Sequence, residues 1–86
     1  MTVEGLRAEI TALDLQILEA VNARIETVEK LRHYKAQHGL PFVDPDREQA
    51  LLRELKVANR GPLSEAGVEA LVTFVLALVK REVTSE

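Results

Sequence analysis

The chain has 86 residues and a mass of 9.6 kDa, which suffices for one domain, residues 1–86, and leaves no room for a second hydrophobic core. With 47% hydrophobic and 29% charged residues, it has the composition of a folding protein rather than of a disordered chain. The absence of cysteine excludes disulfide frameworks and Cys-based metal or nucleophile sites, and it fits a reducing compartment. The net charge of -3 offers no general attraction for nucleic acid or a membrane surface, and no signal peptide or membrane span is evident. We therefore expect a soluble, cytoplasmic protein that binds neither nucleic acid nor membrane.

Residues 3–38 are predicted to form one long helix. Apolar residues recur there at helical spacings of three, four or seven, no proline interrupts them, and Gly39 with Pro41 marks the end. A helix of roughly 35 residues is about 50 Å long, whereas a compact domain of this size has a radius of gyration of about 12 Å. Two shorter helices cannot cover so long an apolar stripe, so we expect an obligate homodimer. The alternative is a kink near Asn22 and a compact monomer.

Two shorter helices are predicted after this one. Asp44 and Pro45 have the pattern of an N-cap followed by proline at the first helical position, and the second helix continues to about Ala58. The segment 59–62 stops it, and Ser64 is a plausible cap for a third helix that runs almost to the end. The expected fold class is all-α, with long, short and medium helices in a helical-bundle homodimer.

Two cations, Arg24 and Lys35, interrupt the apolar stripe of the first helix. They are eleven residues apart, and three helical turns return to almost the same azimuth, so both should face the interior together with the apolar residues between them. A positive charge in the interior is costly unless a negative charge lies next to it. The two cations either pair with acids such as Glu48 or Glu54, or they form a site for an anionic ligand.

A second charged cluster is the segment 44–48, Asp-Pro-Asp-Arg-Glu, at the start of the second helix. A helix N-terminus favours anions or hydroxyl oxygens, but the same residues also fit an N-cap at Asp44 and an exposed pair of Arg47 with Glu48. Arg7 lies off the face of the two interior cations, so it could serve their pocket only from a second copy of the chain. Because no metal cluster, phosphate loop or catalytic triad is present, any reaction must rely on placed charges without a cofactor.

In order and spacing, several short motifs resemble those of the all-helical (type II) chorismate mutases. The matching residues are Leu6-Arg7, Asp14, Arg24, Tyr34-Lys35, Asp44-Pro45-Asp46-Arg47-Glu48 and Gly61-Pro62-Leu63. The resemblance covers nearly the whole chain. It implies an intertwined dimer with paired first helices and two active sites that convert chorismate to prephenate for phenylalanine and tyrosine biosynthesis.

The resemblance also implies roles for three cations. Arg24 corresponds to the arginine that binds one substrate carboxylate, and Arg7 to the arginine that the partner chain donates to the other carboxylate. Lys35 corresponds to the lysine that reaches the ether oxygen and a carboxylate. These side chains suit a rearrangement without proton transfer, because they hold the reactive conformer and face the charge that develops on the ether oxygen.

The second-helix cluster acquires roles in the same way. Asp44 corresponds to the acid whose backbone N–H holds the substrate hydroxyl, together with the side chain of Glu48. Arg47 corresponds to an arginine that supports a carboxylate through water. The resemblance thus implies that all six residues, Arg7, Arg24, Lys35, Asp44, Arg47 and Glu48, bind substrate, and that Lys35, Arg24 and Glu48 are also catalytic.

The third helix departs from the family pattern. The family places a glutamine or glutamate near the end to bond the ether oxygen, with a small polar residue one turn earlier, whereas this chain has Val83 and Val79 there. With a shift of about one residue, Lys80, Glu82 or Thr84 could take the donor position. Loss of such a donor typically costs about 10²- to 10³-fold in rate.

Three other functions remain compatible with the sequence. The first is isochorismate-pyruvate lyase activity on the same fold. The second is a non-catalytic or regulatory helical dimer domain associated with another aromatic-pathway enzyme, and the third is a pure dimerisation module. Turnover by the isolated chain would separate the mutase from the last two.

Overall fold

The computed structural model describes residues 1–85, which form three helices and no strand. The helices are α1 (Val3–Gln37), α2 (Pro45–Ala58) and α3 (Glu65–Thr84), with 35, 14 and 20 residues. The all-α prediction and the order long, short, medium are confirmed.

Each helix begins with a side-chain cap. The Oδ1 atom of Asp44 accepts the backbone N–H of Arg47 at 3.1 Å, and the Oγ atom of Ser64 accepts that of Gly67 at 3.0 Å. Thr2 caps α1 in the same way. Such caps satisfy backbone donors that the helix leaves without partners, which explains why short polar residues fix all three starting points.

The first helix is continuous, so the alternative of a kink near Asn22 is wrong. It ends before Gly39, whose φ of +66° belongs to the left-handed region that glycine adopts without strain. The chain extends over 55 Å with a radius of gyration of 16.0 Å, well above the value of about 12 Å for a compact domain of this size. As expected from its length, α1 is longer than the body formed by the other two helices.

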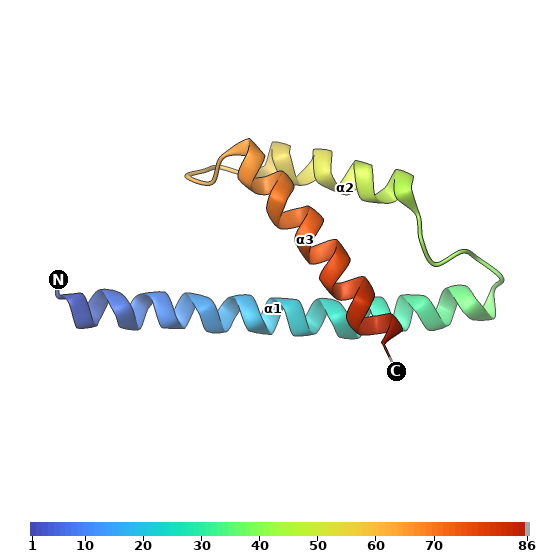
Figure 1. The fold of residues 1–86 in the computed structure, drawn as a ribbon, viewed down its shortest axis with the longest axis horizontal. Coiled ribbons are helices and arrows are strands. Elements are labelled where there is room, and N and C mark those ends of the chain that lie inside the picture. Colours follow the sequence, from blue (N-terminus) through green and yellow to red (C-terminus); the bar gives the residue numbers. More distant parts are fainter. Residues whose placement is uncertain (86) are drawn as a thin grey trace.

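The third helix connects the other two, because it packs against α2 near its start and crosses over α1 near its end (Figure 1). Its inner face supplies all the buried apolar residues that the described chain contains: Val68, Val72, Val79 and Val83. At the crossing, the Nη1 atom of Arg32 on α1 donates to the carbonyl oxygen of Val83 at 3.1 Å. This bond satisfies a carbonyl of the last α3 turn and fastens the end of α3 to α1.

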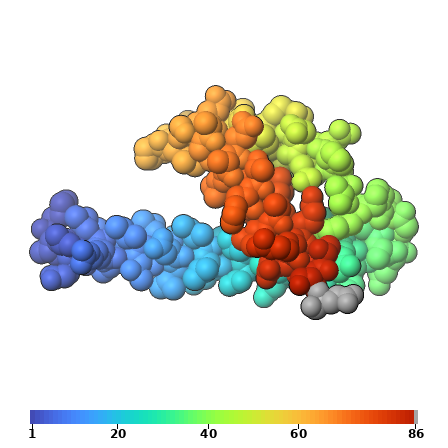
Figure 2. All heavy atoms as spheres, in the orientation of Figure 1, coloured from blue at the N-terminus to red at the C-terminus, as the bar shows by residue number. Residues whose placement is uncertain are grey.

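The N-terminal half of α1 is left uncovered by α2 and α3, and its first turns project beyond them (Figure 2). Its large apolar side chains are 41–63% exposed: Val3, Leu6, Ile10, Leu13, Leu15, Ile17 and Leu18. No residue of α1 is buried within the single chain. Within the described residues, none of the helices has both the length and the apolarity needed to cross a bilayer.

Candidate active site

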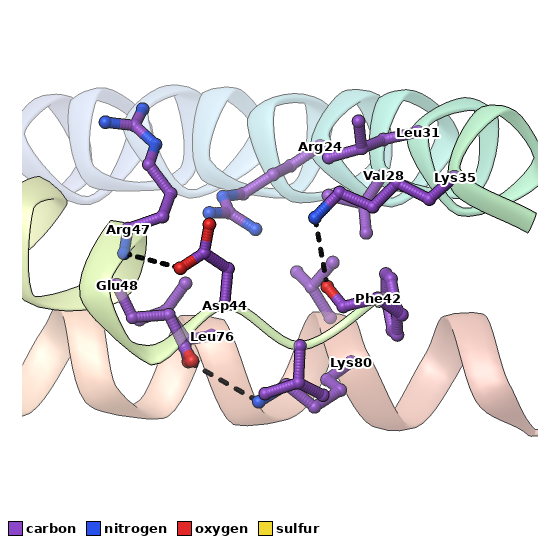
Figure 3. A pocket seen from close by; sticks show the side chains of 12 residues that line it. Arg24, Val28, Leu31, Lys35, Phe42, Asp44, Arg47, Glu48, Leu76 and Lys80 are labelled. Atoms are coloured by element: carbon purple, nitrogen blue, oxygen red, sulfur yellow. Dashed lines mark hydrogen bonds and ion pairs between the residues drawn. The ribbon is translucent and has the colours of Figure 1, made fainter. Parts of the chain in front are cut away.

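A pocket opens where the C-terminal half of α1, the loop before α2, the start of α2 and the end of α3 meet (Figure 3). Its cavity volume is about 120 Å³, and it is open to solvent. In the single chain this volume is smaller than the range of about 300–1,000 Å³ that is usual for small-molecule sites. The two interior cations of α1 and three residues of the 44–48 cluster contribute to its lining, whereas Arg7 does not.

One wall carries the two interior cations of α1. Arg24 and Lys35 both line the pocket, with Val28 and Leu31 between them, so their predicted common face is confirmed. Both are half-buried rather than buried, because the pocket is open. The Nζ atom of Lys35 donates to the carbonyl oxygen of Phe42 at 3.2 Å, which holds its ammonium group at the loop.

The acids expected to neutralise these α1 cations are engaged elsewhere. Glu48 pairs with Lys80 of α3 at 3.4 Å, and Glu54 pairs with Arg47 on its own helix at 3.6 Å. Within the described residues, neither α1 cation forms an ion pair. The internal-pairing interpretation is therefore wrong, and so is the expected pair of Arg47 with Glu48. Two half-buried positive charges face a pocket, which favours an anionic ligand.

The start of α2 forms the adjoining wall. Asp44, Arg47 and Glu48 all line the pocket, as the resemblance to the family implied. The carboxylate of Asp44 serves as the N-cap, while Glu48 is directed toward α3. Arg47 is 63% exposed and lies at the rim, beside Glu54. An Arg at this place can reach an anion in the pocket only by leaving a weak, solvent-exposed ion pair.

The third helix supplies Leu76, Val79 and Lys80 to the lining. Val83 is only 3% exposed and belongs to the core rather than to the pocket. Of the polar residues considered for the donor position, only Lys80 lines the pocket, whereas Glu82 and Thr84 are exposed outside it. Val79 also lines the pocket, and Lys80 beside it therefore brings one cation to the site. Its partner could not be chosen from the sequence, because it depends on how α3 packs against α2.

Arg7 lies outside this pocket, in the projecting half of α1. Seventeen residues separate it from Arg24, which corresponds to about 25 Å along the helix. The same chain therefore cannot bring the two arginines together. Within the described residues, no group of three or more His, Cys, Asp or Glu side chains is placed to hold a metal ion.

Comparison with known proteins gives the family. The model of the family "Chorismate mutase type II" matches residues 6–83. The T-protein of Haemophilus influenzae is 38% identical over 80 residues, which cover 92% of this chain and 20% of that protein. The 4-amino-4-deoxychorismate mutase of Streptomyces venezuelae is 41% identical over 44 residues, which cover 51% of this chain and 43% of that protein. The chain thus spans less than half the length of either relative.

Two solved structures share the fold. Chorismate mutase (Form II) from Thermus thermophilus superposes with a TM-score of 0.91 at 24% identity, covering 98% of this chain and 96% of that one. Form I of the same protein superposes with a TM-score of 0.87 at 26% identity, covering 90% and 96%. The family match spans all three helices, including every residue that lines the pocket. The chain therefore belongs to the type II chorismate mutase family.

Proposed function

We propose that this chain is a chorismate mutase, which rearranges chorismate to prephenate in aromatic amino acid biosynthesis. The observation that carries the proposal is the pair of half-buried cations, Arg24 and Lys35, facing an open pocket without a carboxylate partner of their own among the described residues. Chorismate is a dianion with two carboxylates, so its binding would supply the missing negative charge. Because the chain belongs to the chorismate mutase family, we favour chorismate over other dianions as the ligand.

The rearrangement breaks a C–O bond while a C–C bond forms within one molecule, so no proton transfer and no covalent adduct are required. A site accelerates it by holding the compact conformer and by stabilising negative charge on the ether oxygen. In our proposal the guanidinium of Arg24 binds a carboxylate through its planar fork, and the ammonium of Lys35 faces the ether oxygen and a carboxylate. The bond from Lys35 to the Phe42 carbonyl supports this role, because it already holds the ammonium group on the pocket wall.

The second helix would bind the rest of the substrate. We assign the substrate hydroxyl to the backbone N–H of Asp44 and the carboxylate of Glu48, and a water-mediated carboxylate contact to Arg47. All three residues line the pocket next to the α1 cations, which supports the assignment. No cofactor takes part in this scheme.

We further propose that the active unit is an intertwined homodimer in which Arg7 of one copy completes the pocket of the other. Two features support the dimer. The apolar residues of the projecting half of α1 are about half exposed, and Arg7 cannot reach the pocket of its own chain. The helical face that carries Arg24 and Lys35 continues toward the N-terminus through Leu6, Ile10, Leu13 and Ile17. A second helix packed on this face would therefore extend as far as the pocket.

Association with another aromatic-pathway enzyme is a further part of the proposal. The matching segment is only 20% of the T-protein, so in that relative it belongs to a much longer chain. We expect the cytoplasm as the compartment.

One alternative function, mutase activity on 4-amino-4-deoxychorismate, has a specific observation in its favour. The Streptomyces relative is named for 4-amino-4-deoxychorismate, which carries an amino group where chorismate carries a hydroxyl. If the chain is an isochorismate-pyruvate lyase, it should consume isochorismate. If it is a regulatory domain, it should turn over neither compound.

The test is to follow the loss of chorismate absorbance with the purified chain and to identify prephenate by chromatography. We expect turnover that falls by about a hundredfold or more in Arg24→Ala and Lys35→Ala variants that keep the helical circular dichroism of the wild type. A folded wild-type chain that leaves chorismate unchanged would refute the proposal.

A further inference from the structure

Across the pocket from Arg24 and Lys35 lies an ion pair whose lysine has no role in the proposed reaction. The Nζ atom of Lys80 on α3 is 3.4 Å from the Oε1 atom of Glu48 on α2, and the two side chains are 39% and 30% exposed. Figure 3 shows the pair on the α3 side of the pocket, opposite Arg24 and Lys35. Both residues line the pocket, so a ligand bound there meets the pair as a unit.

The polar groups of the pocket restrict which part of a ligand can lie against this pair. Carboxylates of a dianion are drawn to the α1 cations. The lining contains two carboxylates, and each accepts one hydrogen bond within the chain: Asp44 from the N–H of Arg47 and Glu48 from Lys80. The proposed function assigns the ligand's hydrogen-bond donor to Glu48, whose second oxygen can accept it, and Lys80 lies beside that group.

A hydroxyl and a protonated amine differ in how they fit beside such a pair. A hydroxyl can donate to the carboxylate and accept from the ammonium, so it satisfies Glu48 and Lys80 together. A primary alkyl amine is protonated at neutral pH and has three donors but no acceptor. It would face the like charge of Lys80 and a carboxylate whose negative charge is already compensated.

We propose that Lys80 is a specificity-determining residue, which makes this site prefer a substrate with a hydroxyl at the position facing Glu48 over one with a protonated amine there. This inference rests on the proposed function, because it takes chorismate and 4-amino-4-deoxychorismate as the two substrates. The inference concerns how the site discriminates between these two substrates, because the rearrangement itself is the same for both.

A second ion pair provides the control for a merely structural role. Lys56 on α2 pairs with Glu69 on α3 at 3.1 Å, so it also joins the two helices, but neither residue lines the pocket. If Lys80 acted only by holding α2 against α3, removing the charge of Lys56 would have a similar effect. If Lys80 selects the substrate, only its own removal changes the preference.

The experiment measures kcat/KM for both compounds at pH 7 with the wild type, Lys80→Met, Lys80→Arg and Lys56→Met. We expect the wild type to prefer chorismate. In Lys80→Met, kcat/KM for the amino compound divided by kcat/KM for chorismate should rise by about tenfold or more. The reason is that a like charge beside a bound cation in a partly solvated pocket weakens binding by a factor of that order. Lys80→Arg and Lys56→Met should keep the wild-type ratio.

A wild type that prefers the amino compound would overturn the inference, as would an unchanged ratio in Lys80→Met or an equal rise in Lys56→Met. If Lys80→Met loses the wild-type circular dichroism, Lys80→Gln takes its place with the same expectation. Failure of the proposed function would look different, because no variant would then convert either compound. In that case calorimetric dissociation constants of the two compounds replace the rates, and the inference fails if their ratio is the same in wild type and Lys80→Met.

Discussion

The exposed apolar face in the N-terminal half of α1 predicts that Leu13→Asp dissociates the proposed dimer. Leu13 is 57% exposed in the single chain and lies eleven residues before Arg24, so it shares the face of the α1 cations. Complete burial of a leucine stabilises by about 1.5–3 kcal/mol, so covering the exposed part contributes about 1–2 kcal/mol per copy. The aspartate also places a carboxylate without a partner in an apolar interface, at a cost of several kcal/mol. For two copies we expect a loss of at least about 4 kcal/mol, a roughly thousandfold weaker dimer.

Leu15 provides a matched control for this substitution. It is 55% exposed and lies on the same helix, but at 100° per residue it is about 200° away from Leu13 around the axis. Sedimentation equilibrium at micromolar concentration should show a dimer for the wild type and Leu15→Asp, and a monomer for Leu13→Asp. A monomeric wild type, or equal dimer dissociation constants for Leu13→Asp and Leu15→Asp, would refute the reasoning.

Three further predictions follow from individual contacts. Lys35→Ala should lower kcat by about 10²- to 10³-fold in the chorismate assay, because it removes the proposed donor to the ether oxygen; an unchanged kcat would remove Lys35 from the mechanism. Arg32→Met keeps an unbranched apolar stem but loses the bond to the Val83 carbonyl, so urea unfolding should show a loss of about 1–2 kcal/mol, and no loss would show that this bond contributes nothing to α3 docking. Val79→Ala should cost about 1.5–3 kcal/mol in the same measurement, since Val79 is 1% exposed and its truncation leaves a cavity, and a cost below about 0.5 kcal/mol would contradict its place in the core.

The helices could be predicted from the sequence because their signals are local. The caps at Asp44 and Ser64 lie within three residues of the backbone groups they satisfy, and Gly39 ends α1 through its own conformation. The common face of Arg24 and Lys35 also follows from spacing on a single helix. Each of these inferences needs no knowledge of how one helix packs against another.

The contacts between helices could not be predicted in the same way. The partner of Glu48 is Lys80, thirty-two residues away, and the carbonyl that Arg32 caps is fifty-one residues away. Both depend on the angle at which α3 crosses α1 and α2, which hydrophobic periodicity does not specify. The sequence suggested acids that could neutralise the α1 cations, but the packing of α3 engages Glu48 elsewhere.

The most direct test of a shared chorismate site is activity in mixed dimers of Arg7→Ala and Arg24→Ala. Each variant should be inactive alone, because every site in its homodimer lacks one arginine. After the two are unfolded in urea and refolded together, half of the dimers should be mixed, and each mixed dimer has one site with both arginines intact. We therefore expect about a quarter of the wild-type rate of prephenate formation. A mixture as inactive as its two components, beside a wild type that is active and dimeric, would contradict the shared site.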